Sequence, residues 1–241
     1  MTPPVIIQAG GKGTRLRPYT AVLPKPLMPV GEMPILEVVI RQLVHHGFGD
    51  IWITTSHLAH LIESFFGDGS SWKAHIRYVR EDKPLGTIGP VKQVDRPEVP
   101  FIVMNGDLLT DLDYRAIYAY HLQHDALLTV AVYRGHIPVS LGVLEYDNEK
   151  TVTGFREKPD LYFWASMGIY VFSPELWDMI PDDVNYGFDT LMADMLQRGL
   201  VVKVFPWDRL WLDIGRPEDY EKASETFLQY KSAFLPDSLR A

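Results

Sequence analysis

The chain contains no cysteine, and this absence excludes several kinds of chemistry at once. Disulfide bonds, thiolate metal sites, iron–sulfur clusters and cysteine nucleophiles all require a residue that is not there. No apolar run approaches the roughly 18 residues that span a bilayer, and the N-terminus lacks the basic and apolar regions of a signal peptide. We therefore expect a cytoplasmic protein with no membrane partner.

Basic residues are also few. The 241 residues include 23 Lys and Arg against 31 Asp and Glu, which gives a formal net charge of -8. A protein that grips a DNA or RNA backbone needs a basic face, so we expect no nucleic-acid partner. A small anionic substrate remains compatible with this charge if a few cations gather in one cleft.

Short apolar runs alternate with amphipathic segments through the first half of the chain. Residues 5–8, 51–55, 76–79, 101–104 and 126–132 are typical of buried parallel strands. Residues 34–46 predict a helix that begins at Pro34 and is followed by Gly47. This order predicts an α/β fold with a doubly wound, mostly parallel sheet and ligands at the carboxyl ends of its strands.

The second half changes character. Residues 141–146 and 152–156 predict a small antiparallel β insertion, and a strand is expected over 168–172. Helices are expected over residues 174–180, 188–198 and 217–230. No linker, repeat or low-complexity stretch interrupts the pattern, so a single compact domain over residues 1–241 is the simplest interpretation.

A glycine-rich loop follows the first predicted strand directly. Its sequence is Gly10-Gly11-Lys12-Gly13-Thr14-Arg15, and glycines there let the backbone approach an anion closely. The spacing matches neither the P-loop nor the dinucleotide-binding fingerprint. Lys25 follows between two prolines, which restrict the local backbone. A glycine loop with a rigidly held cation downstream suits a triphosphate.

Six ordered motifs then make a resemblance specific. Gly10 to Arg17 with Pro24-Lys25-Pro26-Leu27, and the later blocks Pro84-Leu85-Gly86-Thr87, Asn105-Gly106-Asp107, Gly154 to Pro159, Gly168 to Phe172 and Trp211 to Gly215, are similar to those of sugar-phosphate nucleotidylyltransferases. The residues of these motifs most resemble those of the mannose-1-phosphate guanylyltransferase branch. The resemblance covers nearly the whole chain. It implies a Rossmann-like nucleotidyltransferase fold, with residues 1–125 mainly binding nucleotide, residues 126–225 mainly binding sugar phosphate, and residues 226–241 forming a C-terminal tail.

The resemblance also implies roles for individual residues. Arg15, Lys25 and Asp107 would be catalytic, and Asp107 and Asp213 would hold the cofactor Mg²⁺. The residues expected to bind the nucleotide are Gln8, Gly10, Gly11, Gly13, Thr14, Gly86, Thr87 and Asn105. Those expected to bind the sugar phosphate are Gly142, Glu157, Lys158, Ser166 and Gly168. Lys158 would grip the phosphate of the sugar, and Glu157 its hydroxyl groups.

Two positions depart from the family pattern. Ser166-Met167 stands where the family usually has Asn-Ala, so we expect an altered acceptor pocket. Met167 is expected to narrow this pocket or to present an apolar wall to it. Lys83 precedes Pro84, where guanylyl-type relatives often carry Glu, which leaves the nucleobase open.

The expected reaction joins a nucleoside triphosphate, most simply GTP, to a sugar 1-phosphate such as mannose 1-phosphate, and releases pyrophosphate. Thymidylyl or uridylyl transfer to glucose 1-phosphate is an alternative. A glycosyltransferase with a similar fold, or a non-catalytic nucleotide-sugar-binding protein, would be a different class. A homodimer is also left open.

Other motifs carry a weaker signal. Asp111-Leu112-Asp113 resembles a glycosyltransferase metal motif, but a solvated loop acid followed by a helix cap at Asp113 is the simpler interpretation. The histidine pairs at residues 45–46 and 57/60 lack a third metal ligand nearby in sequence. Core packing explains most of the tryptophans, although Trp164 lies near the predicted acceptor residues in the sequence and is a candidate to face the sugar.

Overall fold

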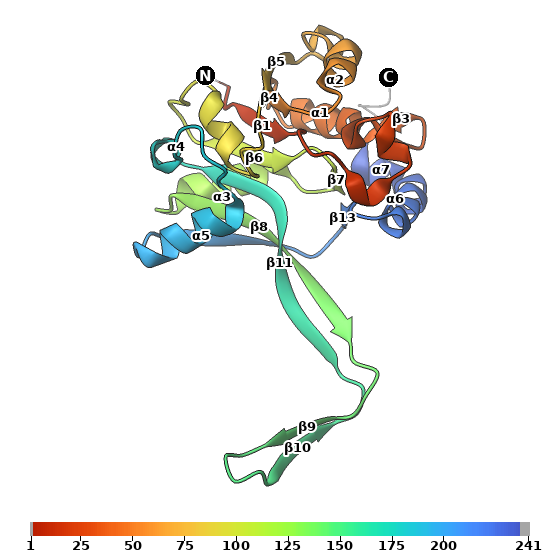
Figure 1. Ribbon diagram of the computed structural model, residues 1–241, viewed down its shortest axis with the longest axis vertical. Helices are drawn as coiled ribbons and strands as arrows, with labels where there is room; N and C mark the ends of the chain where they lie inside the picture. The colour runs from red at the N-terminus through yellow and green to blue at the C-terminus, as the bar shows by residue number, and fades with distance from the viewer. Residues whose placement is uncertain (1, 237–241) are drawn as a thin grey trace.

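A computed structural model describes residues 2–236. Seven strands form the central sheet in the order β12-β8-β11-β6-β1-β4-β5. Strands β6, β1, β4 and β5 are all parallel neighbours, whereas β11 runs antiparallel to β6 and β8 (Figure 1). The strands of this sheet are β1 Val5–Gln8, β4 Asp50–Thr55, β5 His75–Arg80, β6 Phe101–Asn105, β8 Leu128–Pro138, β11 Asp160–Phe172 and β12 Val202–Trp207.

Three small two-stranded sheets and seven α-helices complete the described chain. The small sheets pair β2 Pro29–Val30 with β3 Met33–Pro34, β7 Leu108–Thr110 with β13 Trp211–Asp213, and β9 Val143–Tyr146 with β10 Val152–Arg156. The helices are α1 Ile35–His45, α2 Ala59–Phe66, α3 Tyr114–Gln123, α4 Pro174–Met179, α5 Phe188–Gln197, α6 Pro217–Gln229 and α7 Lys231–Phe234. None of the described helices is long and apolar enough to cross a bilayer.

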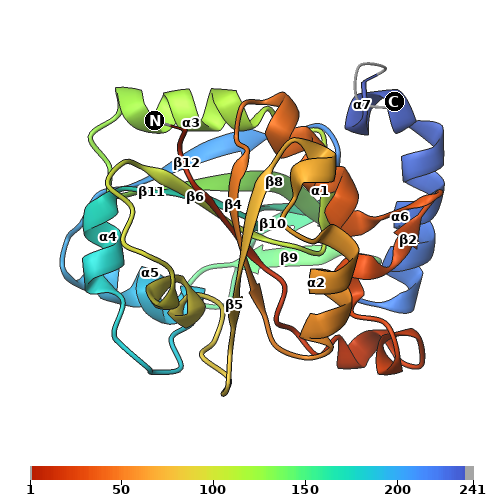
Figure 2. The ribbon, with the colours of Figure 1, turned by 90° about the horizontal axis from the view of Figure 1, so that it is seen from above.

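Alternating side chains of the sheet divide the core into two layers. Val5 and Ile7 of β1 point into a core with residues of α1, α2 and α3, whereas Ile6 points into the opposite core with residues of α4 and α5. This alternation follows from the period of two in a strand, and it gives three layers with helices on both faces of the sheet (Figure 2). The predicted doubly wound α/β fold is confirmed, with β11 as its antiparallel member.

A third core lies at the flank of the sheet. Phe227 of α6 and Phe234 and Leu235 at the end of α7 are fully buried there, against Leu16 and Ile214. The expected C-terminal tail of residues 226–241 is therefore helical and packed as far as the structure describes it, and residues 237–241 lie outside the described residues.

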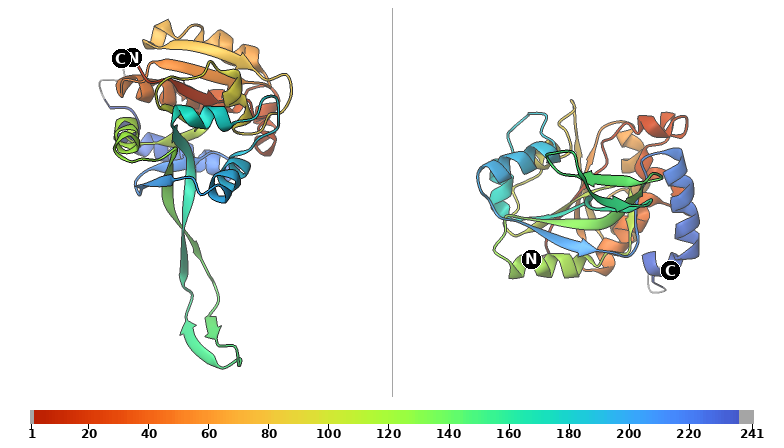
Figure 3. Two further views of the ribbon diagram at one scale, coloured as in Figure 1. Left: turned by 90° about the vertical axis from the view of Figure 1, so that its left-hand side faces the viewer. Right: turned by 90° about the horizontal axis from the view of Figure 1, so that it is seen from below.

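An arm projects from the sheet (Figures 1 and 3). We define it as residues 134–164, which comprise the outer parts of β8 and β11 and the hairpin β9–β10. The predicted strands at 126–132 and 168–172 both continue into the arm, to Pro138 and from Asp160. The backbone hydrogen bonds that pair these two strands do not require a buried face. The end of the apolar pattern in the sequence therefore did not mark the end of either strand. The arm departs from the expectation that the whole chain is compact.

The loop between β7 and α3 shows a second difference from the sequence. Asp113 caps α3, as predicted, because its carboxylate accepts hydrogen bonds from the backbone N–H groups of Arg115 and Ala116. Asp111 was predicted to be a solvated acid, and this was wrong. Its side chain is only 3% exposed and accepts hydrogen bonds from Trp207 Nε1 at 2.9 Å and Leu210 N at 3.1 Å.

Asp111 therefore ties β7 to the loop before β13, and its removal should destabilise the fold. We expect Asp111→Ala to lower the free energy of unfolding by about 2 kcal/mol, because the two N–H donors lose their acceptor and Arg209 loses its partner carboxylate at 3.0 Å. Urea denaturation followed by circular dichroism measures this change. The exposed Asp208, substituted by Ala, serves as the control and should change stability by less than about 0.5 kcal/mol. Equal stability of the two variants would contradict the role of Asp111.

Candidate active site

The carboxyl ends of β6, β1, β4 and β5 meet at one edge of the sheet, and a continuous cleft follows that edge. Three cavities of about 560, 250 and 190 Å³ make up the cleft. The first two share Gln8 and Asp107, and the first and third share Asn105. Open α/β sheets bind ligands at this edge. A larger hollow of about 720 Å³ lies at the opposite edge, where Asp50 and His75 begin β4 and β5, and it contains none of the predicted site residues.

The glycine loop and Lys25 line the cavity of 250 Å³, together with Thr14, Arg15 and Asp107. Gly13 has a φ of 58°, and a Cβ there would lie 2.8 Å from Cγ2 of Thr20. Because that φ disfavours other residues and Thr20 leaves no space, the turn requires glycine. The Thr20 hydroxyl donates to the carbonyl of Gly13 at 2.7 Å and holds the loop in place.

Lys25 is 8% exposed, which is unusual for a lysine. Its ammonium group donates to Oδ2 of Asp107 in an ion pair between the loop after β1 and the end of β6. A buried lysine needs such a partner, because an unpaired charge in the protein interior is costly. The pair holds the cation and the carboxylate at the same wall of the cavity.

Asp213 lies beside Asp107. The residue forms a cross-strand pair with Leu108, the neighbour of Asp107, through the β13–β7 ladder. Asp213 reaches solvent, but partial desolvation of its carboxyl by the surrounding protein raises its pKa, and the carboxylate of Asp107 raises it further, whereas Lys25 and Arg15 lower it. Two neighbouring carboxylates beside a cavity with cations can share a divalent cation with phosphate oxygens. This donor set fits Mg²⁺, which takes one or two carboxylates and completes its shell with phosphates and water.

The cavity of 560 Å³ extends from the glycine loop toward the end of β5. It is lined by Gln8, Gly10, Gly86, Thr87 and Asn105, all of them predicted nucleotide-binding residues. Gln8 Nε2 donates to the carbonyl of Thr87, so β1 contacts the loop after β5 directly. The Thr87 hydroxyl in turn accepts from the backbone N–H of Phe188 at 2.9 Å. The rim of this cavity thus combines three distant segments.

Glu81 also lines this cavity, and the sequence analysis missed it. The residue directly follows β5, so its position at a strand end was the available signal. Burial raises the pKa of the Glu81 carboxyl, although the backbone N–H of Leu85 lowers it in part. A Cβ at position 10 would collide with Oε1 of Glu81, so Gly10 also leaves space for this carboxylate.

The cavity of 190 Å³ is bordered by Ser166, Gly168, Trp211 and Asp213, with the stacked rings of Tyr170 and Phe188, whose centroids are 4.3 Å apart. Gly168 has a φ of 72°, and a Cβ there would lie 2.6 Å from Nδ2 of Asn105. An aromatic wall with a carboxylate at one end is suited to a polar molecule with apolar faces, such as a sugar.

The structure differs from the sequence-based expectation at two residues near this cavity. Met167 borders it, but its side chain is 1% exposed and belongs to the main core, so it is no open apolar wall. Trp164 is 56% exposed on the arm and is not among the lining residues, which include Trp211 instead. Alternation explains the first result, because Ser166 faces the cavity while its neighbour Met167 faces the core. Trp164 misses the cavity because it lies farther out along the ladder, where it pairs with Arg134 on the arm.

Three predicted acceptor residues lie away from the cleft. Gly142, Glu157 and Lys158 are on the arm, where they are exposed to solvent. A Cβ at Gly142 would lie 3.2 Å from Oε2 of Glu157, so these two residues are neighbours there. Lys158 Nζ lies 4.0 Å from Oε1 of Glu157. The structure thus unites the other predicted site residues in the cleft and leaves these three outside it.

Comparisons with known proteins agree with this geometry. A family model described as nucleotidyl transferase matches residues 4–230. A UTP–glucose-1-phosphate uridylyltransferase from Synechocystis sp. is 34% identical over 90% of this chain and 61% of its own length. A mannose-1-phosphate guanylyltransferase from Mycobacterium tuberculosis is 31% identical over 91% of this chain and 63% of its own length. The chain thus spans less than two thirds of either relative.

Solved structures show the same fold. HddC from Yersinia pseudotuberculosis aligns with a TM-score of 0.74 and 30% identity, over 94% of this chain and 100% of that one. The same protein complexed with GMP-PN aligns with a TM-score of 0.71 and 28% identity, over the same shares of the two chains. The resemblance stated from the motifs is confirmed at the level of the family.

The cavity of 250 Å³ has the cations and amides to hold a chain of phosphates, and this can be tested without any assumed reaction. We expect Lys25→Ala to weaken the binding of inorganic triphosphate roughly 10-fold or more, because a charged hydrogen bond is lost. Isothermal titration calorimetry measures the dissociation constant. The control, Lys222→Ala on the exposed surface of α6, should leave it unchanged. Equal affinity in both variants would exclude Lys25 from the phosphate site.

Proposed function

The chain belongs to the nucleotidyl transferase family, and from this premise we propose that it joins GTP to a sugar 1-phosphate, giving a GDP-sugar and pyrophosphate. The observation that carries the proposal is the single cleft in which the Lys25–Asp107 ion pair, the glycine loop and Asp213 converge. A phosphate-binding loop alone would suit many proteins. The additional pair of carboxylates and the adjacent aromatic cavity fit a second, sugar-bearing substrate.

In this reaction an oxygen of the sugar phosphate attacks the α-phosphorus of the triphosphate. The bond from the α-phosphorus to the bridging oxygen breaks, and pyrophosphate leaves with that electron pair. Arg15 and Lys25 hold the phosphates and neutralise the charge that develops on them. The attacking oxygen is already ionised near neutral pH, so no side chain has to remove a proton.

Asp107 and Asp213 would hold the magnesium ion. When bound, that ion supplies charge neutralisation at the phosphate oxygens. The amides of the loop from Gly10 to Thr14 would orient the triphosphate so that the α-phosphorus faces the acceptor cavity. Positioning and electrostatics together account for catalysis of this type.

Guanine is the base that best fits the cavity of 560 Å³. Its edge presents an N1–H and an N2 amino donor, and the Glu81 carboxylate offers two acceptor oxygens in the cavity beside the glycine loop. The complex of HddC with GMP-PN supports this choice, because that relative is similar over nearly the whole chain. Uridylyl transfer is the second candidate, supported by the Synechocystis relative at 34% identity.

The decisive experiment is a grid of nucleoside triphosphates against sugar 1-phosphates with Mg²⁺, scored by pyrophosphate release. We expect GTP with mannose 1-phosphate or a related sugar to give the highest kcat/KM. Turnover confined to UTP or dTTP would reject the guanylyl assignment, and no turnover with any pair would reject the reaction.

The proposed metal-binding carboxylates can be tested with any pair of substrates that gives turnover. We expect Asp213→Asn to lower kcat roughly 10³-fold, because the loss of one carboxylate weakens the metal site that neutralises phosphate charge. Circular dichroism should show that the fold survives, since Asp213 reaches solvent at the end of a short strand. A comparable substitution outside the cleft, Asp182→Asn in the exposed loop after α4, should leave kcat unchanged. Near-normal turnover of Asp213→Asn would remove this residue from the mechanism.

Base recognition by Glu81 can be tested separately. Glu81→Gln keeps the shape of the side chain but replaces one acceptor oxygen with an NH₂ donor that opposes the donors of guanine. We expect kcat/KM for GTP to fall roughly 10- to 100-fold, the effect of one or two lost charged hydrogen bonds. Turnover of UTP or ATP should not fall with it. An equal loss for all nucleotides would mean that Glu81 only supports the loop.

A further inference from the structure

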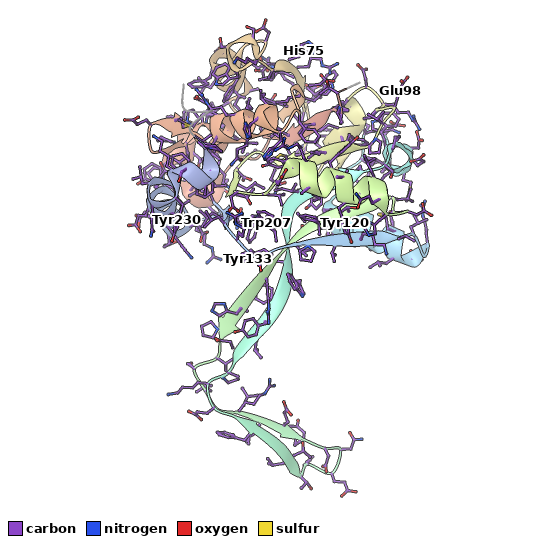
Figure 4. All side chains as sticks on the ribbon, turned by 180° about the vertical axis from the view of Figure 1, so that it is seen from behind. His75, Glu98, Tyr120, Tyr133, Trp207 and Tyr230 are labelled. Atoms are coloured by element: carbon purple, nitrogen blue, oxygen red, sulfur yellow. The ribbon has the colours of Figure 1, made fainter. Side chains whose placement is uncertain are left out.

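The arm carries an unusual amount of exposed apolar surface. None of its residues, 134–164, is buried. Ten of the twenty exposed large hydrophobic side chains in the described part of the chain belong to this short segment. Figure 4 shows the arm leaving the body near Tyr133 and Trp207, with side chains projecting on both sides of a bare ribbon. Exposed apolar surface of this extent is typical of an interaction site.

The apolar residues of the arm are arranged on defined faces. In the hairpin β9–β10, Leu144 pairs with Phe155 and Tyr146 pairs with Val152, so all four lie on one face. Their exposed fractions range from 57% to 69%. A hairpin of two strands is marginally stable in water unless a face is covered. The hairpin face therefore needs a partner surface that the body of its own chain does not provide.

The cleft has a matching deficiency. Among the described residues, those that line the acceptor cavity of 190 Å³ include no Lys or Arg, while Asp213 contributes a negative charge. Lys25 and Arg15 line the neighbouring cavity, where the triphosphate is placed. The phosphate of a sugar 1-phosphate needs a cation of its own in such a place.

The arm carries four basic residues, Arg134, Lys150, Arg156 and Lys158. Arg134 lies over the ring of Tyr162, Arg156 pairs with Glu145 at 2.9 Å, and Lys150 lies in the turn of the hairpin. Lys158, between the hairpin and β11, has a side chain that is 67% exposed.

The ladder of the arm keeps Lys158 away from its own cleft. Ser166 borders the acceptor cavity and pairs with Val132, and the pairing continues without interruption to Asp160 and Pro138. At about 3.3 Å per residue, Asp160 lies on the order of 20 Å from Ser166 along the strand, and Lys158 lies beyond it. A lysine side chain is too short to bridge that distance, so return to the same cleft requires breaking the ladder.

We infer that the arm seats on a second copy of this chain and that its Lys158 completes the acceptor site of that copy. This inference rests on the proposed function, because it assigns the ammonium group of Lys158 to the phosphate of the sugar substrate. Exchange is reciprocal about a two-fold axis, so each copy gives an arm and receives one. The arrangement covers the apolar hairpin face, leaves both ladders intact and brings a cation to each acceptor cavity.

The molar mass in solution is the first test. Size-exclusion chromatography with light scattering should give a dimer for the full chain. Phe155→Asp, which places a charge on the hairpin face, should shift the mass toward the monomer without loss of secondary structure. Leu122→Asp on the exposed face of α3 is the matched control and should remain a dimer. A monomeric wild-type protein, or equal masses for all three proteins, would overturn the inference.

Mixing two defective variants tests whether the arm acts across the dimer. Lys25→Ala has a damaged cleft and an intact arm, whereas Lys158→Ala has an intact cleft and a damaged arm. At acceptor concentrations below KM both should be nearly inactive alone. After mixing with exchange of subunits, half of the dimers are mixed and each holds one complete site, so about a quarter of wild-type activity should return.

Activity of the mixture no higher than the mean of the two variants would mean that the arm serves its own cleft and would overturn the inference. The two proposals fail differently. If the wild-type protein releases no pyrophosphate with any substrate pair, the proposed reaction is rejected, while the molar masses still decide whether the hairpin face binds a second copy.

Discussion

The ion pair between buried Lys25 and half-buried Asp107 is the contact on which the cleft depends. It connects the segment after β1 with the end of β6, two neighbouring strands whose loops would otherwise be independent. The burial of Lys25 is tolerable only with Asp107 beside it. The pair also keeps the second carboxylate, Asp213, close to two cations, which lower its pKa against the effect of partial desolvation.

A catalytic arrangement follows from this constraint. One wall of the cavity holds a cation, a pair of carboxylates and a turn of glycines, all supported by β1, β6 and β7. The base cavity opens on one side of this wall and the aromatic cavity on the other, sharing Asn105. A nucleotide and a second substrate can therefore meet with the phosphates between them, which is the order that nucleotidyl transfer requires.

The arm shows how an extended ladder can move residues away from a site. Strands β8 and β11 are part of the central sheet at one end and a free ribbon at the other. Strand β11 therefore carries Ser166 of the acceptor cavity at one end and Asp160 at the other, and Lys158 lies beyond Asp160, far from the cavity. If a second copy receives the arm, the quaternary structure and the acceptor site have a common origin.

The sequence by itself determined the alternation of strands and helices, the loop from Gly10 to Arg15, and the carboxylates at strand ends. These features are local, since each depends on the period of a few residues or on a motif directly after a strand. Glycine, proline and charged residues in fixed order also carried the resemblance to a family. The sequence therefore predicted the α/β fold and most residues of the cleft.

Only the tertiary structure decided which of these residues meet. It buried Asp111 and Met167, brought Glu81 into the base cavity, and placed Lys158 outside the cleft. Burial depends on what distant segments pack against a residue, and no local pattern encodes this. The length of a free ribbon is equally invisible in sequence, because its strands are held by backbone hydrogen bonds that any alternating sequence can form.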